Sequence, residues 1–333
     1  MVDLNKQKEK MLNIALNKIS GDWDRVKIKD LLLEIDTGEN DMNLTGWGEQ
    51  EIEDLMTEFH VEPEEDDFDV DKAVEDIKEP ICKRGDIWQL GDHRLGCGDA
   101  TVEEDVKKLM DGKKADICFT SPPYNAGSLN IKGQSGTQPK YINPEKILDE
   151  KDYNSFLIKV FGLAIKYSDE VFINIGLVES NKRSIIYLLN SFISEFKDII
   201  YWKKSTVAPH IQNGIINNLV EFIFAFGNGK RKFKNANFSQ GTCWNVVEGK
   251  NASGNEYSDI HKATFPIYLP DFIIKNFTKT NQLVLDNFIG TGTTLIACEK
   301  TNRKCYGMEI DPHYCDVTIN RWQDFTGNKA VKL

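Results

Sequence analysis

Two short stretches of the sequence carry residue types that could hold a ligand and react with it. The first, residues 120–124, reads TSPPY and follows the apolar run 116–119, which is typical of a buried parallel strand. Two consecutive prolines neither pair in a sheet nor continue a helix, so the backbone leaves the strand in a stiff, extended turn. Such a turn presents a hydroxyl, fixed carbonyl oxygens and an aromatic face, which suit a planar group that bears an amine. A structural proline turn with a core tyrosine is the alternative.

The second stretch, residues 283–294, reads LVLDNFIGTGTT and predicts a buried strand, a glycine-rich turn and the start of a helix. Gly290 and Gly292 would let the backbone approach a ligand closely. The next expected strand ends in Glu309, about 20 residues on, where folds of this kind bind ribose hydroxyls. The turn has neither the full G-x-G-x-x-G of a dinucleotide site nor the G-K-[ST] of a phosphate loop. The pattern therefore indicates a nucleoside-bearing cofactor other than NAD or ATP.

Strands that alternate with helices must position these two stretches. The expected strands lie at 116–119, 171–175, 199–202, 219–226, 283–286 and 305–309, and the expected helices at 102–110, 153–167, 184–196 and 295–300, with a hairpin over 85–99. This alternation predicts an α/β fold with a doubly wound, mostly parallel sheet. Because no helix separates the third and fourth of these strands, we expect an antiparallel hairpin at the sheet edge.

The part of the chain before residue 83 has a different composition. Residues 1–60 predict three short amphipathic helices, which could form a small bundle or a docking segment, and residues 61–82 predict a solvated acidic linker before a larger domain over 83–330. Residues 1–80 carry a net charge of −15, whereas the remaining residues carry +4, out of −11 for the whole chain. The larger domain could therefore accommodate a polyanion despite the acidic total.

Other classes of protein are disfavoured by what the sequence lacks. No apolar run approaches the ~20 residues that span a bilayer, and the N-terminus has no signal-peptide pattern, so we expect a cytoplasmic protein. The seven cysteines form no C-x-x-C pair, which supports neither a disulfide framework nor a metal site. The basic cluster at 230–234 predicts either phosphate contacts or a solvated turn.

The two stretches together resemble the S-adenosylmethionine-dependent DNA amino-methyltransferases that modify N4 of cytosine or N6 of adenine. The signature turn [D/N/S]-P-P-[Y/F] of that family matches residues 121–124, and its cofactor loop F-x-G-x-G-T matches 288–293. A catalytic turn that precedes the cofactor loop is the permuted, β-class order. The resemblance implies a Rossmann-like class I methyltransferase fold over about 85–325. Residues 15–17, 22–24 and 44–52 resemble the helical tail of a ParB-like domain, for which no activity is implied.

The resemblance also implies roles for individual residues. The catalytic residues would be Ser121, Pro122, Pro123 and Tyr124. The cofactor-binding residues would be Asp99, Ala100, Phe265, Pro266, Asp286, Phe288, Gly290, Gly292, Thr293 and Glu309. The DNA-binding residues would be Lys203, Lys204, Lys230, Arg231, Lys232 and Lys234, within a target-recognition region at about 203–257. No metal is implied. The expected partner is double-stranded DNA, and a homodimer and a cognate restriction endonuclease are left open.

The expected mechanism follows from the chemistry of an exocyclic amine, which is conjugated with its ring and lies out of reach inside a duplex. The nucleotide must be flipped into a pocket, where Tyr124 would stack on the base. The Pro122 carbonyl would accept an amino hydrogen, and the Ser121 hydroxyl would contact the amine or the adjacent ring nitrogen. Family members with S-P-P-Y more often modify cytosine N4, so cytosine is favoured over adenine N6. An inactive DNA-binding or scaffold protein with this fold is the alternative from another class.

Overall fold

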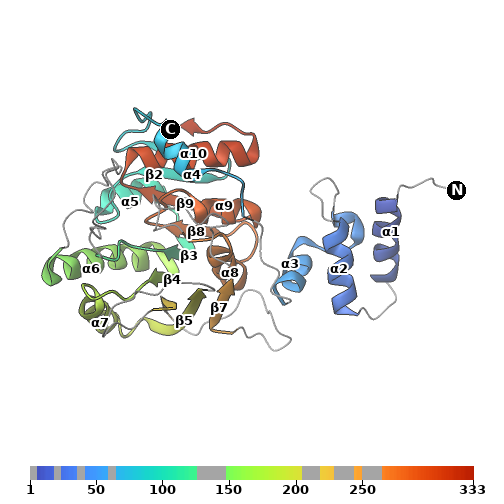
Figure 1. The fold of residues 1–333 in the computed structure, drawn as a ribbon, viewed down its shortest axis with the longest axis horizontal. Helices are drawn as coiled ribbons and strands as arrows, with labels where there is room; N and C mark the ends of the chain where they lie inside the picture. The colour runs from blue at the N-terminus through green and yellow to red at the C-terminus, as the bar shows by residue number, and fades with distance from the viewer. Residues whose placement is uncertain are drawn as a thin grey trace, which may run out of the picture. The chain divides into compact units, whose positions relative to one another are not determined.

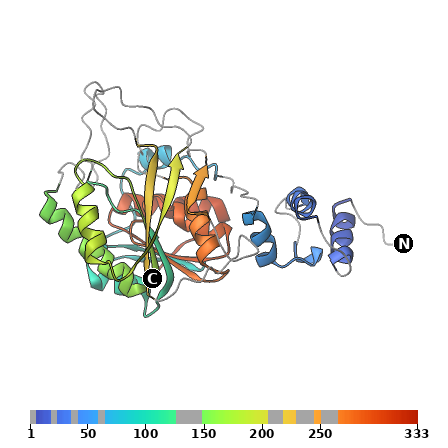
Figure 2. The same cartoon turned by 90° about the horizontal axis from the view of Figure 1, so that it is seen from below.

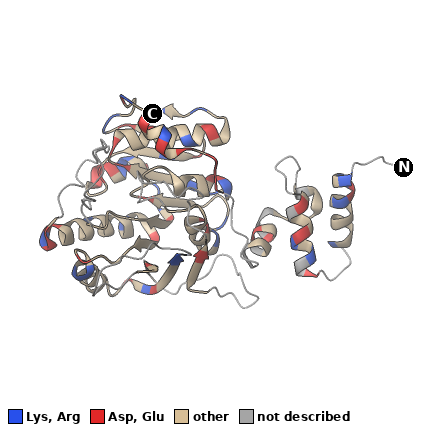
Figure 3. Cartoon of the chain, in the orientation of Figure 1, with Lys and Arg blue, Asp and Glu red and all other residues tan. Residues whose placement is uncertain are grey.

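The computed structural model describes residues 6–18, 24–35, 42–58, 65–125, 148–204, 218–228, 244–249 and 265–333. The chain divides into two compact units, the smaller formed mainly by residues 1–62 and the larger by residues 63–232 and 244–333. The smaller unit contains α1 (Lys6–Lys18), α2 (Arg25–Ile35), η1 (Met42–Thr45) and α3 (Glu49–Glu58). Its helices bury one apolar cluster that includes Met11, Leu32 and Leu55. In α3 the charged residues are all Glu or Asp (Figure 3).

The larger unit is built on a ten-stranded sheet, as counted in the described part of the chain (Figure 1). Its strands are β1 (Ile87–Leu90), β2 (His93–Cys97), β3 (Ala115–Thr120), β4 (Ser168–Ile175), β5 (Phe196–Lys204), β6 (Val220–Gly227), β7 (Val246–Gly249), β8 (Leu283–Asp286), β9 (Lys304–Glu309) and β10 (Val331–Lys332). Their order is β10-β1-β2-β9-β8-β3-β4-β6-β5-β7. The predicted hairpin at Gly91 and Asp92 is present between β1 and β2.

The middle five strands, β2, β9, β8, β3 and β4, are mutually parallel. The strand β6 then lies antiparallel between β4 and β5. This arrangement confirms the α/β fold class with its mostly parallel sheet. The predicted antiparallel pair, β5 and β6, is present but does not form the edge, because β7 pairs with the outer side of β5. The sequence of β7 is too short to have been recognised as a strand.

Helices cover both faces of the sheet (Figure 2). On one face α5 (Glu103–Met110), α6 (Glu150–Tyr167) and α7 (Lys182–Ser191) contribute to a core cluster that includes Leu109, Phe161 and Leu188. On the other face lie α8 (Tyr268–Phe277), α9 (Thr293–Lys300) and α10 (Pro312–Thr326). Apolar strand residues such as Phe119, Phe172 and Leu285 are fully buried between the two layers.

A further segment, residues 65–82, precedes the first strand and is called the strap below. It contains α4 (Val70–Asp76), which begins at the N-cap Asp69 and packs on α10 (Figure 1). Val74 of α4 shares a buried cluster with Tyr314 and Val317 of α10. The strap therefore differs from the solvated linker that its acidic composition predicts, because its few apolar residues find a partner helix far along the chain.

Candidate active site

The parallel strands place both sequence stretches at one edge of the sheet. Since β3 and β8 are direct neighbours, with Cys118 opposite Leu285, the turn after β3 lies beside the loop after β8. Glu309 ends the next strand, β9, and Asp99 follows β2 beyond it. Open α/β sheets bind ligands at the carboxyl ends of their strands. Residues 121–124, 288–293 and 309 are thus brought together as predicted.

The proline turn holds its hydrogen-bonding groups in fixed roles. The Ser121 Oγ lies 3.1 Å from the carbonyl oxygen of Asn174 and 3.3 Å from the Tyr124 hydroxyl oxygen, so its one hydrogen is donated to these protein acceptors and an oxygen lone pair stays available. The Tyr153 hydroxyl donates to the Pro123 carbonyl at 2.7 Å. None of the hydrogen bonds within the described part of the chain uses the Pro122 carbonyl. The turn therefore carries two candidate acceptors on consecutive residues, Ser121 Oγ and Pro122 O.

The phenol of Tyr124 is tied to the sheet by its hydroxyl. That hydroxyl donates to Glu221 Oε2 at 2.7 Å and accepts from Asn174 Nδ2 at 3.0 Å, and the same Asn174 nitrogen lies 3.1 Å from Glu221. Burial, and then the nearby Glu221 carboxylate, raise the pKa of Tyr124 well above its usual value, so the phenol stays protonated. A Cβ on Gly176 would lie 3.0 Å from the Tyr124 ring, so only glycine leaves room for it.

Residues around Tyr124 include several that sequence reasoning missed. Asn174 interrupts the apolar run 171–175 within β4, Glu221 interrupts the apolar strand β6, and these interruptions were the available signal. Asn181 is fully buried and donates to the carbonyls of Tyr124 and Gly176, both at 2.9 Å. Together these residues set the position of the Tyr124 ring from two neighbouring strands and a helix start.

The glycine loop after β8 has a backbone conformation that favours glycine at two positions. Gly290 and Gly292 have φ of 54° and 87°, in the left-handed region that favours glycine. A Cβ on Gly290 would make only an ordinary contact, 3.9 Å from the Phe288 carbonyl oxygen, whereas one on Gly292 would lie 2.9 Å from Thr318 Cγ2 of α10. The helix α9 begins at Thr293, so its first amides point into the loop. The loop thus leaves its backbone uncovered at Gly290 and packs against Thr318 of α10 at Gly292.

Glu309 reaches across to the same loop. Its Oε2 accepts from the Gly290 amide at 3.1 Å, and its Oε1 accepts from the Asp311 amide at 2.9 Å. Burial raises the pKa of Glu309 to about 7, and the two backbone donors oppose that shift. The carboxylate is therefore held against the loop and retains lone pairs that could accept from ligand hydroxyls.

Asp286 lies deeper than a ligand contact would require. It is fully buried and accepts from Thr120 Oγ1 and Thr294 Oγ1, both at 2.7 Å, and from the Phe288 amide at 3.0 Å. Burial raises the pKa of Asp286 to about 6. With these three donors the carboxylate joins the catalytic strand β3 to the cofactor loop and α9, which is a positioning role. The adjacent Asn287 is 1% exposed, and neither amide atom has a partner in the described structure, so a polar ligand could supply one.

The remaining predicted cofactor residues surround this edge. Asp99 follows β2 and accepts from the amide and hydroxyl of Thr101, both at 2.8 Å, while Ala100 beside it is buried. Phe265 packs its ring edge-on against Phe119 of β3, with 5.5 Å between centroids, and Pro266 is buried.

The predicted DNA-binding lysines are in part paired with acids. Lys203 Nζ lies 2.8 Å from Glu248 Oε1, and Lys204 forms an ion pair with Glu221 while its ammonium stands over the Trp202 ring. The four other predicted cations, Lys230, Arg231, Lys232 and Lys234, lie outside the described residues. Lys204 is thus linked to Tyr124 through the shared carboxylate of Glu221.

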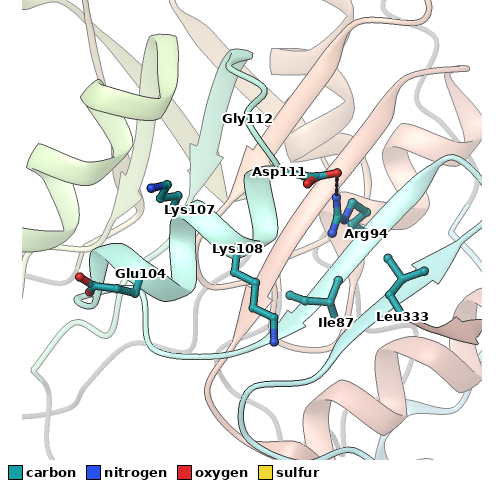
Figure 4. A pocket seen from close by; sticks show the side chains of 8 residues that line it. All are labelled: Ile87, Arg94, Glu104, Lys107, Lys108, Asp111, Gly112 and Leu333. Atoms are coloured by element: carbon teal, nitrogen blue, oxygen red, sulfur yellow. Dashed lines mark ion pairs between the residues drawn. The ribbon is translucent and has the colours of Figure 1, made fainter.

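Other features of the described residues do not add a second site. Within them, no group of His, Cys, Asp and Glu is arranged to hold a metal ion, and no helix is long and apolar enough to cross a membrane. A shallow pocket between α5 and the β1–β2 hairpin is lined by Lys107, Lys108 and Arg94, whose guanidinium pairs with Asp111 at 2.7 Å (Figure 4). Arg94 stands near the start of β2, away from the carboxyl edge.

The comparisons with known proteins agree with this geometry. A family model described as DNA methylase matches residues 115–320. The chain belongs to this DNA methylase family. The match covers both the SPPY turn and the glycine loop, and the methyl donor of the family is S-adenosyl-L-methionine.

Relatives of this DNA methylase are Type II methyltransferases. M2.LlaDCHI of Lactococcus lactis subsp. cremoris is 25% identical over 237 residues, which covers 66% of this chain and 87% of that protein. M.MjaI of Methanocaldococcus jannaschii is also 25% identical, over 276 residues, with the same coverage. The solved structure of PvuII DNA methyltransferase (cytosine-N4-specific) superposes with a TM-score of 0.52 at 19% identity, over 69% of this chain and 86% of that one. That likeness supports the class I methyltransferase fold.

Proposed function

We propose that this DNA methylase transfers a methyl group to the exocyclic amine of a base flipped out of duplex DNA, with N4 of cytosine as the favoured target. The observation that carries the proposal is the pair of acceptors at the turn, Ser121 Oγ and Pro122 O, on the strand next to the glycine loop. An exocyclic amine carries two hydrogens and needs two acceptors. We also propose that the chain has the permuted, β-class order, in which the catalytic turn precedes the cofactor loop. We propose further that its N-terminal helices are the tail of a ParB-like domain.

The loop and its surroundings fit an adenosyl group that carries a methionine tail. Gly290 leaves its backbone uncovered by a side chain, and Glu309 beside it supplies carboxylate oxygens for ribose hydroxyls. Asn287 offers an unpaired buried amide, and Phe288 an apolar ring. When bound, the donor supplies an electrophilic methyl group on a sulfonium. We assign its binding to Phe288, Gly290, Gly292, Thr293 and Glu309, with Asp99, Ala100, Phe265 and Pro266 around it.

The chain's own residues then act on the amine. Ser121 Oγ, whose hydrogen is donated to Asn174 O or to the Tyr124 hydroxyl, accepts one amino hydrogen, and the Pro122 carbonyl accepts the other. These contacts turn the nitrogen lone pair out of conjugation and toward the methyl group. As the new C–N bond forms, the carbon–sulfur bond breaks and leaves a neutral thioether, and the surplus amine proton leaves to solvent. The rate enhancement would come from positioning the amine and from electrostatic stabilisation of the transition state, with no covalent enzyme intermediate.

The choice of base rests on Ser121. A carboxylate at this position would be a stronger acceptor, whereas a serine whose hydrogen is already directed inward is a neutral acceptor. Cytosine and adenine both carry an unprotonated ring nitrogen beside the amine, so we propose cytosine from the serine and keep adenine N6 as the second candidate.

The direct test is methyl transfer from labelled S-adenosylmethionine to duplex DNA, followed by digestion to nucleosides. We expect label in N4-methylcytosine. Label in N6-methyladenine would support methylation of an exocyclic amine but would show that cytosine is not the target base. A protein that binds the cofactor but transfers no label would instead be the inactive DNA-binding alternative.

Cofactor affinity should depend on pH through Glu309. Because burial raises the pKa of this carboxyl from 4.5 to about 7, the acid is partly protonated at neutral pH, and only the carboxylate can accept from both ribose hydroxyls. Affinity should therefore fall as the pH drops from 8 to 6, by up to ~10-fold per unit below the pKa.

The titration can be followed by calorimetric measurement of the cofactor Kd in a series of buffers, with Glu309→Gln as the control that flattens the profile. The stability of the cofactor-free protein should rise as the pH falls, whereas its affinity for the cofactor should decrease. A raised pKa means that the folded state holds the proton more tightly, so stability gains from Glu309 as the pH falls from about 7 toward 4.5. A Kd that is constant from pH 8 to 6 would exclude the carboxylate from ribose binding.

A further inference from the structure

The strap carries the most deeply buried bidentate ion pair in the described part of the chain. Asp66 accepts from Arg321 through both oxygens, Oδ2 from Nε and Oδ1 from Nη2, each at 2.6 Å. The side chains are only 8% and 4% exposed. A fork-to-fork pair of this kind fixes the guanidinium plane, because both ends of the carboxylate are engaged.

The free end of the same guanidinium holds the glycine loop. Arg321 Nη1 donates to the Thr291 carbonyl and to Thr293 Oγ1, both at 3.1 Å. These two residues flank Gly292, which has φ of 87° and no room for a side chain. A chain of direct contacts therefore runs from the strap through Arg321 to the turn proposed to bind the cofactor.

Further contacts fix the strap to the elements around that turn. Glu65, next to Asp66, accepts at Oε1 from the Ile267 amide at 2.8 Å, directly after Phe265 and Pro266. At its other end, the strap donates the Ile81 and Cys82 amides to the carboxylate of Asp316 on α10, at 2.5 and 3.0 Å. Between these ends, α4 packs its apolar face on α10. The strap thus contacts α10 from Tyr314 to Arg321. It also contacts the segment after Pro266 directly, and the glycine loop through Arg321.

We propose that Asp66 is a positioning residue for cofactor binding, which acts through Arg321 to hold the glycine loop in its binding conformation. The inference rests on the proposed cofactor site. It gives the acidic segment before the first strand a function in the reaction, exerted through Arg321.

The test compares Asp66→Asn with Asp67→Asn in the full chain. Both variants remove one negative charge from the strap, but Asp67 is exposed and has no part in this contact chain. We expect Asp66→Asn to raise the Kd and KM for S-adenosylmethionine about tenfold, with kcat at saturating cofactor and the Kd for duplex DNA within about twofold of wild type. Asp67→Asn should match wild type in every parameter. A merely structural role would lower the melting temperature without separating the two affinities.

A second measurement uses the unmodified protein, in case Asp66→Asn does not fold. Hydrogen exchange with and without S-adenosylmethionine should show added protection at the strap amides as well as at the glycine loop, because coupling of this kind is reciprocal. Protection of the loop with an unchanged strap would overturn the inference, as would equal cofactor affinity in Asp66→Asn and wild type. Failure of wild type to bind the cofactor would overturn the proposed function, and the inference with it.

Discussion

Replacing Tyr124 with alanine should lower the rate of methyl transfer to DNA by about 10- to 100-fold at saturating cofactor, since stacking of an aromatic ring on a base contributes ~1–3 kcal/mol. The ring is held by its hydroxyl bond to Glu221 and by the close approach of Gly176. Removing the side chain would take away the stacking surface and leave Asn174 and Glu221 without their shared partner. The glycine loop is untouched by this change, so the Kd for S-adenosylmethionine should stay within about twofold of wild type.

The measurement is single-turnover methylation with saturating cofactor, combined with calorimetric titration of S-adenosylmethionine. Tyr124→Phe is the matched control. It keeps the ring and loses only the hydroxyl, so its rate should lie between those of wild type and Tyr124→Ala. If Tyr124→Ala weakened cofactor binding as much as it slowed transfer, the stacking role assigned to this residue would be contradicted.

Gly292→Ala should weaken binding of S-adenosylmethionine by at least about tenfold and lower the free energy of unfolding by ~1–3 kcal/mol. An alanine at this position would be strained in two ways, by its backbone conformation and by a steric contact. The backbone has φ of 87°, which alanine adopts at a cost, and the new Cβ would lie 2.9 Å from Thr318 Cγ2. Relief requires the loop or α10 to move. Thr318 also donates to the Gly290 carbonyl at 2.9 Å, so the displacement would reach the part of the loop that faces the cofactor.

Gly327→Ala separates these two strains. Gly327 has φ of 71°, at the C-cap of α10, and a Cβ there would meet nothing within 4 Å. This variant should therefore lose only the ~1 kcal/mol that a left-handed alanine costs, with cofactor affinity unchanged. Thermal unfolding and cofactor titration of both variants would check the pair of expectations. Equal cofactor affinity in Gly292→Ala and wild type would remove the glycine loop from the binding site.

The features that local chemistry determines could be predicted from the sequence. The run 116–119 is apolar enough to be a buried strand, and the prolines at 122 and 123 can only end it, so strand and turn were both expected. The same holds for β8 and the glycine-rich turn that follows it, in which Gly290 and Gly292 have positive φ. The α/β fold class followed from the alternation of such elements. These predictions succeeded because neighbouring residues alone decide them.

The features that depend on distant partners could not be predicted. Asp66 was expected in solvent because it sits among carboxylates, yet it pairs with Arg321, 255 positions further along the chain. The ion pair of Lys204 with Glu221 was likewise not foreseen. Glu221 itself contacts Tyr124 only because β6 is inserted antiparallel beside β4, and nothing in the residues between them indicates that order. Such contacts require the strand order to be known first.

The pairing of β3 with β8 has a consequence for how the enzyme acquires its structure. These two strands form the centre of the sheet, yet Thr120 and its partner Asp286 are 166 residues apart in the chain. Contacts between such distant segments have a large entropic cost of loop closure and tend to form slowly. During synthesis, the SPPY turn emerges long before the strand that must stand beside it. The two halves of the reaction centre are therefore expected to meet only in a late stage of folding, when β8 pairs with β3.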